Sequence, residues 1–289
     1  MKKLTLLLFI PLVFACSGDK KNDLDEMNLK GKVKSLKETT YSAVEKFGEP
    51  VKDELMDKYE YIFNEDGFIK ETDIFNESRE LEFKWKYKYD DDGNRIESNM
   101  YINDGELEEK QKGKYDNDGN VIEVNIYDKD GEIIEKWKYK YDDDGNRIEQ
   151  NRYDADGELN YKYKYKYDDD GNRIELSSYD ADGELLSKLK SKFDDDGNWI
   201  EFSSYDKDGE LNYKYKYKYD NDGNRIEQNR YDADGELMYK TEYEYKEFDN
   251  NKNWLKRIEY YKEYEDEKDA EIIEREDAKI TEREIEYYD

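Results

Sequence analysis

A glycine within an acidic turn recurs in this chain with a 26-residue period, and no other feature constrains the fold as strongly. One series of glycines extends from Gly67 to Gly223 at this spacing, and a second extends from Gly105 to Gly235, each 12 residues after a member of the first. The clearest unit, YDDDGNRIELSSYDADGELLSKLKSK, occupies residues 167–192. Self-similarity at a fixed period indicates a repeat architecture in which each unit packs on its neighbours.

Each glycine ends a short cluster of Asp and Asn, such as DDDG, DNDG, DADG or DKDG. Asp and Asn hydrogen-bond to nearby backbone and glycine adopts positive φ without strain, so each cluster predicts a hairpin turn. The spacing of successive turns leaves strands of about eight and ten residues, in alternation, between them. We therefore expect antiparallel strands that run up and down as a meander, with the first-series turns on one rim and the second-series turns on the other.

The long strands alternate between aromatic and basic side chains. In residues 159–167, Leu159 and four tyrosines share one predicted face and three lysines share the other. In the short strand that follows, the same alternation predicts Arg173 and Glu175 on one face, with Ile174 and Leu176 on the other.

A glutamate in each short strand can meet lysines of the neighbouring strand. These residues are Glu97, Glu123, Glu149, Glu175, Glu201 and Glu227. Opposite charges paired across strands contribute about 0.2–1 kcal/mol per pair.

Neither face has enough aliphatic side chains for the inside of a thick sandwich. About 14 strands at roughly 4.8 Å spacing would form a sheet about 65 Å long. Two forms of an elongated all-β meander or solenoid stay open: a free-standing twisted ribbon, or a sheet that coils so that its tyrosine face turns inward. We assign residues 28–66 to an N-terminal capping hairpin, 67–247 to the β-hairpin repeats and 248–289 to a divergent C-terminal capping repeat whose end favours strands over a helix.

Residues 1–16 predict export. Lys2 and Lys3 precede an apolar run that ends at Phe14, and Ala15 and Cys16 follow. A run of this length with a charged start is typical of a signal peptide. The sequence Val-Phe-Ala-Cys at its end resembles the lipobox of bacterial lipoproteins, which implies cleavage before Cys16 and acylation of that residue; the alternative is a signal peptide that ends near a chance cysteine.

Residues 17–27 are polar and predict a flexible tether between the lipid and the folded domain. We therefore expect an outer-membrane lipoprotein of the cell envelope, attached to the membrane through this lipid. Removal of Lys2 and Lys3 leaves 47 of the 49 basic residues against 78 acidic residues. A field of that sign repels phosphate backbones, so we expect no nucleic-acid partner.

The motif Tyr-Asp-x-x-Gly-Asn-x-Ile, as in YDDDGNRI from Tyr141 and from Tyr167, resembles the YD repeats of Rhs-type proteins. This resemblance covers roughly residues 60–260 and implies antiparallel sheets that wind into shells, with a carbohydrate-binding or toxin-encapsulating role. The repeat region has no proline and too few repeats to close a large shell, so we do not expect the toxin role. With Cys16, the chain looks more like the small YD-repeat lipoproteins of Bacteroidetes.

The residue inventory excludes much of enzyme chemistry. The chain has no histidine, and Cys16 is its only cysteine, so Ser–His, Cys–His and His–zinc arrangements cannot form. Carboxylate pairs suited to glycoside hydrolysis recur in every repeat and therefore specify no site. We expect no catalytic residues, no enzyme activity and no cofactor.

The acidic turns do not match a calcium-binding EF-hand loop. With Gly171 at position 6, Lys166 falls at position 1 and Ser177 at position 12, where the loop requires carboxylates. Turn chemistry explains these aspartates, and weak Ca²⁺ binding by the acidic rims is the one metal interaction left open.

Tyrosine ladders suggest a binding face, because aromatic side chains stack on sugar rings or pack against a partner's apolar surface. The unit that contains Leu185 and Leu189 is the most apolar departure from the repeat. The candidate ligand-facing residues are Tyr161, Tyr163, Tyr165, Trp199, Phe202, Tyr213, Tyr215 and Tyr217. The alternative is that these rings form only the buried face of the sheet.

These patterns together predict a non-enzymatic, lipid-anchored β-repeat protein that acts as a binding or structural module, with an unknown protein or glycan partner. A carbohydrate-binding protein that uses the tyrosine ladders is the first alternative. A glycosidase that uses carboxylates is the second.

Overall fold

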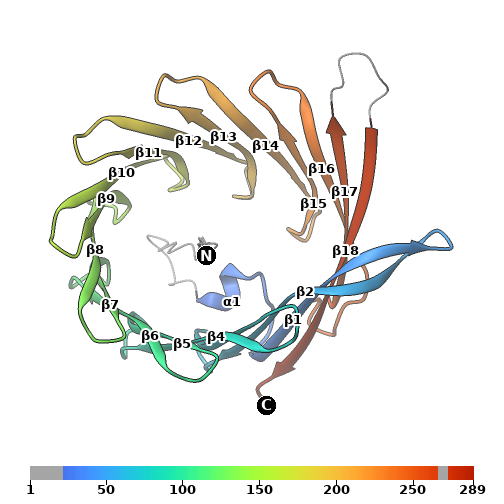
Figure 1. The fold of residues 1–289 in the computed structure, drawn as a ribbon, viewed down its shortest axis with the longest axis horizontal. Coiled ribbons are helices and arrows are strands. Elements are labelled where there is room, and N and C mark those ends of the chain that lie inside the picture. The colour runs from blue at the N-terminus through green and yellow to red at the C-terminus, as the bar shows by residue number, and fades with distance from the viewer. Residues whose placement is uncertain (1–21, 266–272) are drawn as a thin grey trace.

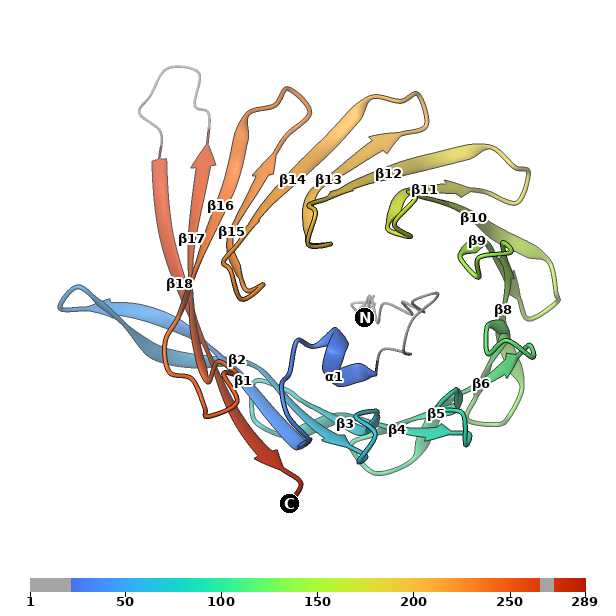
Figure 2. The same ribbon diagram turned by 180° about the vertical axis from the view of Figure 1, so that it is seen from behind.

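The computed structural model describes residues 22–265 and 273–289, which form a single antiparallel sheet of 18 strands. Consecutive strands pair with each other, and the first strand also pairs with the last, so the sheet closes into a β-barrel (Figures 1 and 2). The signal peptide, Cys16 and residues 17–21 of the tether lie outside the described residues. A short helix, α1 (Asp23–Glu26), lies inside the ring of strands.

The strands of the barrel are β1 (Val33–Lys46), β2 (Glu49–Phe63), β3 (Ile69–Phe75), β4 (Leu81–Tyr89), β5 (Arg95–Ile102), β6 (Leu107–Tyr115), β7 (Val121–Asp128), β8 (Ile133–Tyr141), β9 (Arg147–Asp154), β10 (Leu159–Tyr167), β11 (Arg173–Tyr179), β12 (Leu185–Phe193), β13 (Trp199–Asp206), β14 (Leu211–Tyr219), β15 (Arg225–Tyr231), β16 (Leu237–Tyr245), β17 (Lys256–Glu265) and β18 (Ile273–Tyr287).

The antiparallel meander is confirmed, but the elongated, open solenoid is wrong, because the sheet coils until its first and last strands pair and it closes. The register shifts in nearly every hairpin pair, as between Lys166 and Tyr167 where β10 pairs with β11. Such bulges bend a strand and increase its twist, so repeated bulges curve the sheet. The curvature brings the two terminal hairpins together, and Leu36 pairs with both Tyr61 of β2 and Ile285 of β18. The strand preference for the end of the chain is confirmed by β18.

The acidic turns form as the sequence predicts. In the turn before β11, the Asp168 backbone N–H donates to the Asn172 carbonyl at 3.0 Å, and Asp168 Oδ1 accepts from the backbone N–H groups of Asp170 and Asn172. Arg79 and Lys252 stand where the repeat has its turn glycine, and they adopt φ values of 66° and 67° there. The turn hydrogen bonds hold these residues in a conformation that non-glycine residues rarely adopt.

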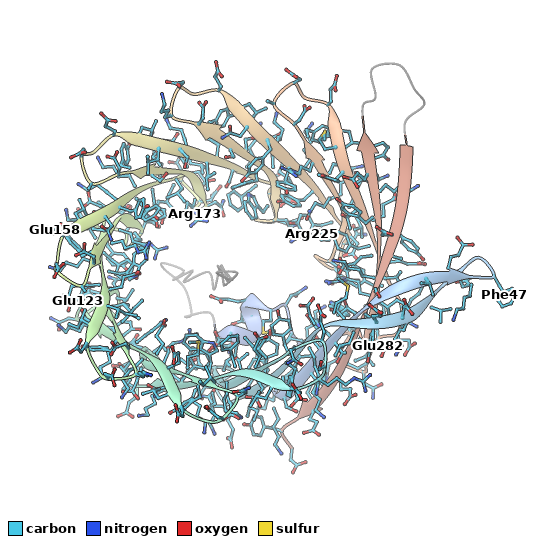
Figure 3. All side chains as sticks on the ribbon, viewed as in Figure 1. Phe47, Glu123, Glu158, Arg173, Arg225 and Glu282 are labelled. Carbon is cyan, nitrogen blue, oxygen red and sulfur yellow. The ribbon has the colours of Figure 1, made fainter. Side chains whose placement is uncertain are left out.

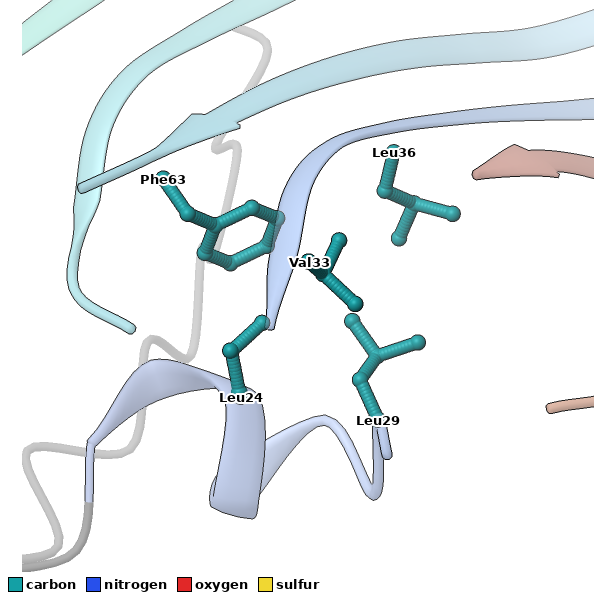
Figure 4. Close-up of a cluster of buried hydrophobic side chains, with 5 residues drawn as sticks. All are labelled: Leu24, Leu29, Val33, Leu36 and Phe63. Carbon is teal, nitrogen blue, oxygen red and sulfur yellow. The ribbon is translucent and has the colours of Figure 1, made fainter. Parts of the chain in front are cut away.

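The aliphatic core lies where the barrel closes. Leu24, Leu29, Val33, Leu36 and Phe63 form one buried cluster, in which α1 and the segment after it pack against β1 and β2 (Figure 4). The Leu24 backbone N–H also donates to the Gly67 carbonyl at 3.3 Å. Part of the predicted tether is therefore a structural component of the barrel interior.

The β1–β2 hairpin extends beyond the rest of the barrel wall (Figure 1). Phe47 at its tip has a φ of 57°, and its side chain is fully exposed. Across the described ranges, 22–265 and 273–289, no helix is long and apolar enough to cross a membrane.

Candidate functional site: the aromatic and arginine-lined inner wall

The inner and outer faces of the barrel carry different charged residues. Arg173 and Arg225 lie on the inner side of the ring of strands, whereas Glu123 and Glu158 lie on the outer side (Figure 3). The tyrosine-bearing faces of the long strands share the inner side with these arginines, and we call this combined surface the inner wall. A lumen enclosed by about 16–18 strands is wide enough to hold water or ligand rather than being filled by side chains.

The inward position of Arg173 corrects the face that simple alternation predicts. Tyr167 pairs with Arg173 while Lys166 pairs with Glu175, so Ile174 is an extra residue in the bulge. The bulge places Arg173 beside the tyrosines, with its guanidinium 5.8 Å from the Tyr165 ring centroid. Glu175 stays on the outer face with the lysines.

Arginines stack on the aromatic rings of the inner wall. The Arg147 guanidinium lies 4.9 Å from the Tyr165 ring centroid and 5.5 Å from that of Tyr139. The arginines that make such contacts are Arg95, Arg147, Arg152, Arg173, Arg225, Arg230, Arg257 and Arg283. A guanidinium is planar and more weakly hydrated than an ammonium group, which suits it to this half-buried position.

The last tyrosine of most long strands has a structural role. The Tyr141 hydroxyl donates to the Val121 carbonyl at 2.8 Å, and the Tyr167 hydroxyl donates to the Arg147 carbonyl at 2.9 Å. The same bond, always to the residue 20 positions earlier, is made by Tyr89, Tyr115, Tyr219 and Tyr245. These hydroxyls satisfy backbone carbonyls at the bulges, which explains the tyrosine of the repeat motif.

Five of the predicted ligand-facing residues form one continuous group on β13 and β14. Trp199 meets Phe202 edge-on with a centroid distance of 5.2 Å and lies 5.6 Å from Tyr217. Tyr215 stacks on Tyr217 at 6.1 Å, and Tyr213 contacts both Tyr215 and Phe202. The structure therefore brings together Trp199, Phe202, Tyr213, Tyr215 and Tyr217.

The other three predicted residues lie on β10, away from that group. Tyr163 stacks on Trp137 of β8 at 6.1 Å, and the Tyr165 hydroxyl donates to Gln150 Oε1 at 2.7 Å. Between the two aromatic groups, β11 and β12 carry smaller side chains, among them the hydrogen-bonded pair Ser178 and Ser187 with 2.7 Å between their Oγ atoms. Tyr161 is 38% exposed and Tyr165 is 8% exposed, so the rings of the wall differ in access.

Burial on the inner wall changes the ionisation of its tyrosines. Burial raises the pKa of Tyr115 to about 12, although the nearby Arg95 acts in the opposite direction. Burial likewise raises the pKa of Tyr217 to about 12, against the opposing effect of Arg225. These hydroxyls are therefore protonated hydrogen-bonding groups at neutral pH.

One arginine of the inner wall binds a carboxylate from the chain itself. Arg95 Nη2 lies 3.4 Å from Asp23 Oδ1. The other oxygen of Asp23 accepts from the Ile69 backbone N–H at 2.6 Å and lies 3.3 Å from the Tyr89 hydroxyl. The arginine, the tyrosine and the backbone amide thus form a carboxylate site, which α1 occupies.

The outer face confirms the predicted charge ladder. Lys88 Nζ lies 2.7 Å from Glu97 Oε1, and Lys166 Nζ lies 2.9 Å from Glu175 Oε1. The corresponding lysine contacts are made by Glu123, Glu149, Glu201 and Glu227. The hydrogen bond from Lys88 and a second from Asn99 lower the pKa of Glu97.

The rim aspartates direct their oxygens at their own turns. Asp168 Oδ2 accepts from the Asn172 side-chain amide at 3.2 Å, while Oδ1 accepts the two backbone bonds described above. In the part of the chain that the structure describes, no group of three or more His, Cys, Asp or Glu side chains is arranged to hold a metal ion. Weak Ca²⁺ binding at the rims stays a prediction.

Sequence reasoning missed the inner arginines as site residues. The usable signal was the partition of cations, because arginine follows the Gly-Asn pair at the start of several short strands while lysine fills the long strands. A fixed choice of arginine over lysine indicates stacking or bidentate binding rather than charge alone.

The fold and the inner wall define a closed, 18-stranded antiparallel β-barrel whose lumen is lined by aromatic rings and arginines. Among solved structures, the chain is similar to a porin-like protein from Bacteroides uniformis, with 12% identity, a TM-score of 0.48, and coverage of 89% of this chain and 99% of that one. It is also similar to the toxin complex TcdB2-TccC3, with 12% identity and a TM-score of 0.29, over 74% of this chain and 15% of that one. A Tc holotoxin pore from Photorhabdus luminescens matches with 12% identity and a TM-score of 0.25, over 77% of this chain and 15% of that one.

No protein-family model matches the chain, and no curated protein matches it.

Proposed function

We propose that this protein is a non-enzymatic binding module of the bacterial cell envelope, and that it holds an extended glycan against the inner wall of its barrel. The observation that supports this proposal is the position of the aromatic rings. They lie on a concave wall and several are partly exposed, as Tyr161 is at 38%, instead of packing into an apolar core. Aromatic side chains on a concave face offer flat surfaces on which sugar rings stack.

The proposed attachment to the envelope is through lipid on Cys16. The outer face of the wall carries the lysine–glutamate ladder, whereas membrane-spanning barrels carry an apolar band on that face. Lysine at the bilayer midplane costs about 2–4 kcal/mol per residue, so repeated lysines disfavour contact between this wall and lipid. The lipobox-like residues before Cys16 and the YD-like motif of the turns support a YD-repeat lipoprotein.

The binding proposal is tested by a glycan-array screen of the full-length protein in detergent, repeated with added calcium and with a chelator. We expect reproducible binding of at least one extended glycan and a loss of at least tenfold in affinity for Tyr215→Ala on the inner wall. Tyr179→Ala is the matched control, because Tyr179 lies on the outer face with Lys164 Nζ 5.4 Å from its ring centroid. A blank array, or equal losses for the two variants, contradicts glycan binding in the lumen.

The attachment proposal is tested separately with Cys16→Ser. We expect this variant to lose the lipid-dependent mass and to leave the membrane fraction. Unchanged processing and fractionation would remove the lipoprotein assignment without affecting the binding proposal.

A further inference from the structure

The carboxylate site around Asp23 recurs in the repeated wall. Its parts are the Ile69 backbone amide, the Tyr89 hydroxyl and the Arg95 guanidinium. Each of these residues lies beside a bulge near the rim that carries the first series of glycine turns. At these bulges Phe63 pairs with Ile69, and Tyr89 pairs with Arg95.

Three sets of residues, at whole multiples of the repeat period from this site, carry the same tyrosine and arginine, with a different residue at the backbone-amide position. They are Val121 with Tyr141 and Arg147, then Arg147 with Tyr167 and Arg173, then Trp199 with Tyr219 and Arg225. In each set the tyrosine hydroxyl donates to the carbonyl of the first residue, as Tyr89 does to Ile69. In each set the tyrosine also pairs across the bulge with the arginine. The local backbone is therefore equivalent to that around Asp23.

Of these four sets, only the one at Arg95 receives a carboxylate from the described chain. Among residues 22–265 and 273–289, Arg147, Arg173 and Arg225 have no ion-pair partner within 4.0 Å, although 78 residues of the sequence are acidic. Arg225 Nη1 donates to the neutral Gln228 Oε1 at 2.9 Å. All three guanidiniums lie on the inner wall and stack on tyrosine rings.

We propose that Arg147, Arg173 and Arg225 bind the carboxylates of an acidic glycan, as Arg95 binds Asp23. This inference rests on the proposed function and names the class of glycan: a chain that contains uronic acids. The guanidiniums of the inner wall attract its carboxylates locally, against the repulsion from the net negative charge of the whole chain. A charge-assisted bond between guanidinium and carboxylate is about twice as strong as a neutral hydrogen bond. Arg147 and Arg173 start β9 and β11 with one strand between them, which places them about 10 Å apart along the wall.

The closed sheet favours a glycan over an acidic peptide. An extended peptide commonly binds by adding a strand to a free sheet edge, where its main chain gains hydrogen bonds. The pairing of β1 with β18 removes that edge from this sheet. A glycan needs no edge, because its rings stack on accessible aromatic faces of the inner wall such as Tyr161, which is 38% exposed.

The test measures binding of oligogalacturonate and oligoalginate to the full-length protein in detergent by calorimetry, beside carboxyl-reduced forms of the same oligosaccharides. We expect the acidic forms to bind at least tenfold more tightly than the reduced forms, with affinity that falls as salt is added. The double variant Arg147→Gln/Arg173→Gln is expected to lose at least tenfold in affinity for the acidic forms. Arg79→Gln is the matched control, because Arg79 lies in an exposed rim turn.

Thermal unfolding of each variant shows whether the barrel is intact, and Arg225→Gln provides an independent variant if the double change prevents folding. Equal binding of acidic and reduced oligosaccharides, or losses no larger than that of Arg79→Gln, overturns the carboxylate inference and leaves glycan binding in place. Binding of poly-glutamate as tight as that of the oligouronates overturns the choice of glycan. A protein that binds none of these probes and gives a blank glycan array contradicts the proposed function itself.

Discussion

At the seam, where β1 lies between β2 and β18, Leu36 is fully buried between Tyr61 and Ile285, whereas Leu189 in the repeated wall keeps part of its side chain exposed. Within the described ranges, the cluster of buried aliphatic side chains lies at the seam. The wall instead uses tyrosine hydroxyls on backbone carbonyls, arginines stacked on rings, and lysine–glutamate pairs.

This difference follows from the kind of neighbours that each strand has. A wall strand has a similar strand on each side, so each polar contact is repeated and many small contributions add up. The seam joins strands that are far apart in sequence and carry no repeat register. Burial of apolar area supplies about 25 cal/mol per Å² there, without needing a repeated partner.

The largest effect is expected at alkaline pH, because alkali ionises tyrosines along the whole wall at once. Free tyrosine ionises near pH 10, whereas the pKa values of Tyr115 and Tyr217 are raised to about 12. Between these values the folded state holds more protons than the unfolded state, so the free energy of unfolding falls as pH rises from about 10 to about 12. Circular dichroism and tyrosinate absorbance should change together in this interval; tyrosines that all ionise near pH 10 in an intact barrel would contradict this.

The next largest effect is expected for Leu36→Ala at the seam. Removal of a fully buried leucine side chain leaves a cavity and should lower the free energy of unfolding by about 2–5 kcal/mol. Leu189→Ala in the wall is the matched control and should cost less than about 1.5 kcal/mol, because its side chain is already partly in water. Urea unfolding of both variants measures the difference, and equal losses would show that the wall has an apolar core of its own.

A smaller effect is expected for the tyrosine–carbonyl bonds of the wall. Tyr141→Phe removes the hydroxyl that donates to the Val121 carbonyl and should cost about 1 kcal/mol. Phe193 occupies the corresponding position on β12. Phe193→Tyr should therefore add the missing hydrogen bond from a tyrosine hydroxyl to the Arg173 backbone carbonyl and stabilise the barrel by up to about 1 kcal/mol. Thermal unfolding of both variants tests the pair, and shifts of the same sign would contradict it.

The smallest effect is expected for the outer charge ladder. Glu97→Gln removes the contact with Lys88, whose side chain is 65% exposed, so the loss should be under about 1 kcal/mol and decrease in high salt. Acid should have the same destabilising effect, because the pKa of Glu97 is lowered in the folded state. The contribution of Glu97 to the free energy of unfolding is present above about pH 4–5 and is lost as pH falls through the folded-state pKa. Glu158→Gln, in a rim turn, is the control for loss of charge, and a salt-independent loss for Glu97→Gln would point to packing instead.

Local features of the barrel were accessible from the sequence. The turn clusters, the antiparallel meander and the six outer glutamates with their lysine partners depend on residues a few positions apart, and all are confirmed. Of the candidate site, alternation places Tyr213, Tyr215 and Tyr217 on one face, as they lie in the structure. Trp199 meets Phe202 on that face only because of a bulge at Ile200. The inward arginines were not placed correctly, because a bulge of one residue at Ile174 reverses the face that alternation assigns to Arg173.

The sequence by itself determined the strands, their order and the charge pairs across them, because each depends on contacts between neighbours in a repeat. Only the tertiary structure decided that the sheet closes, that the tyrosines face a lumen, and that Asp23 reaches Arg95 from a segment that precedes β1. Closure is the sum of many small bends and depends on the pairing of β1 with β18, in which Leu36 meets Ile285 from the other end of the described chain. No local pattern encodes such a contact.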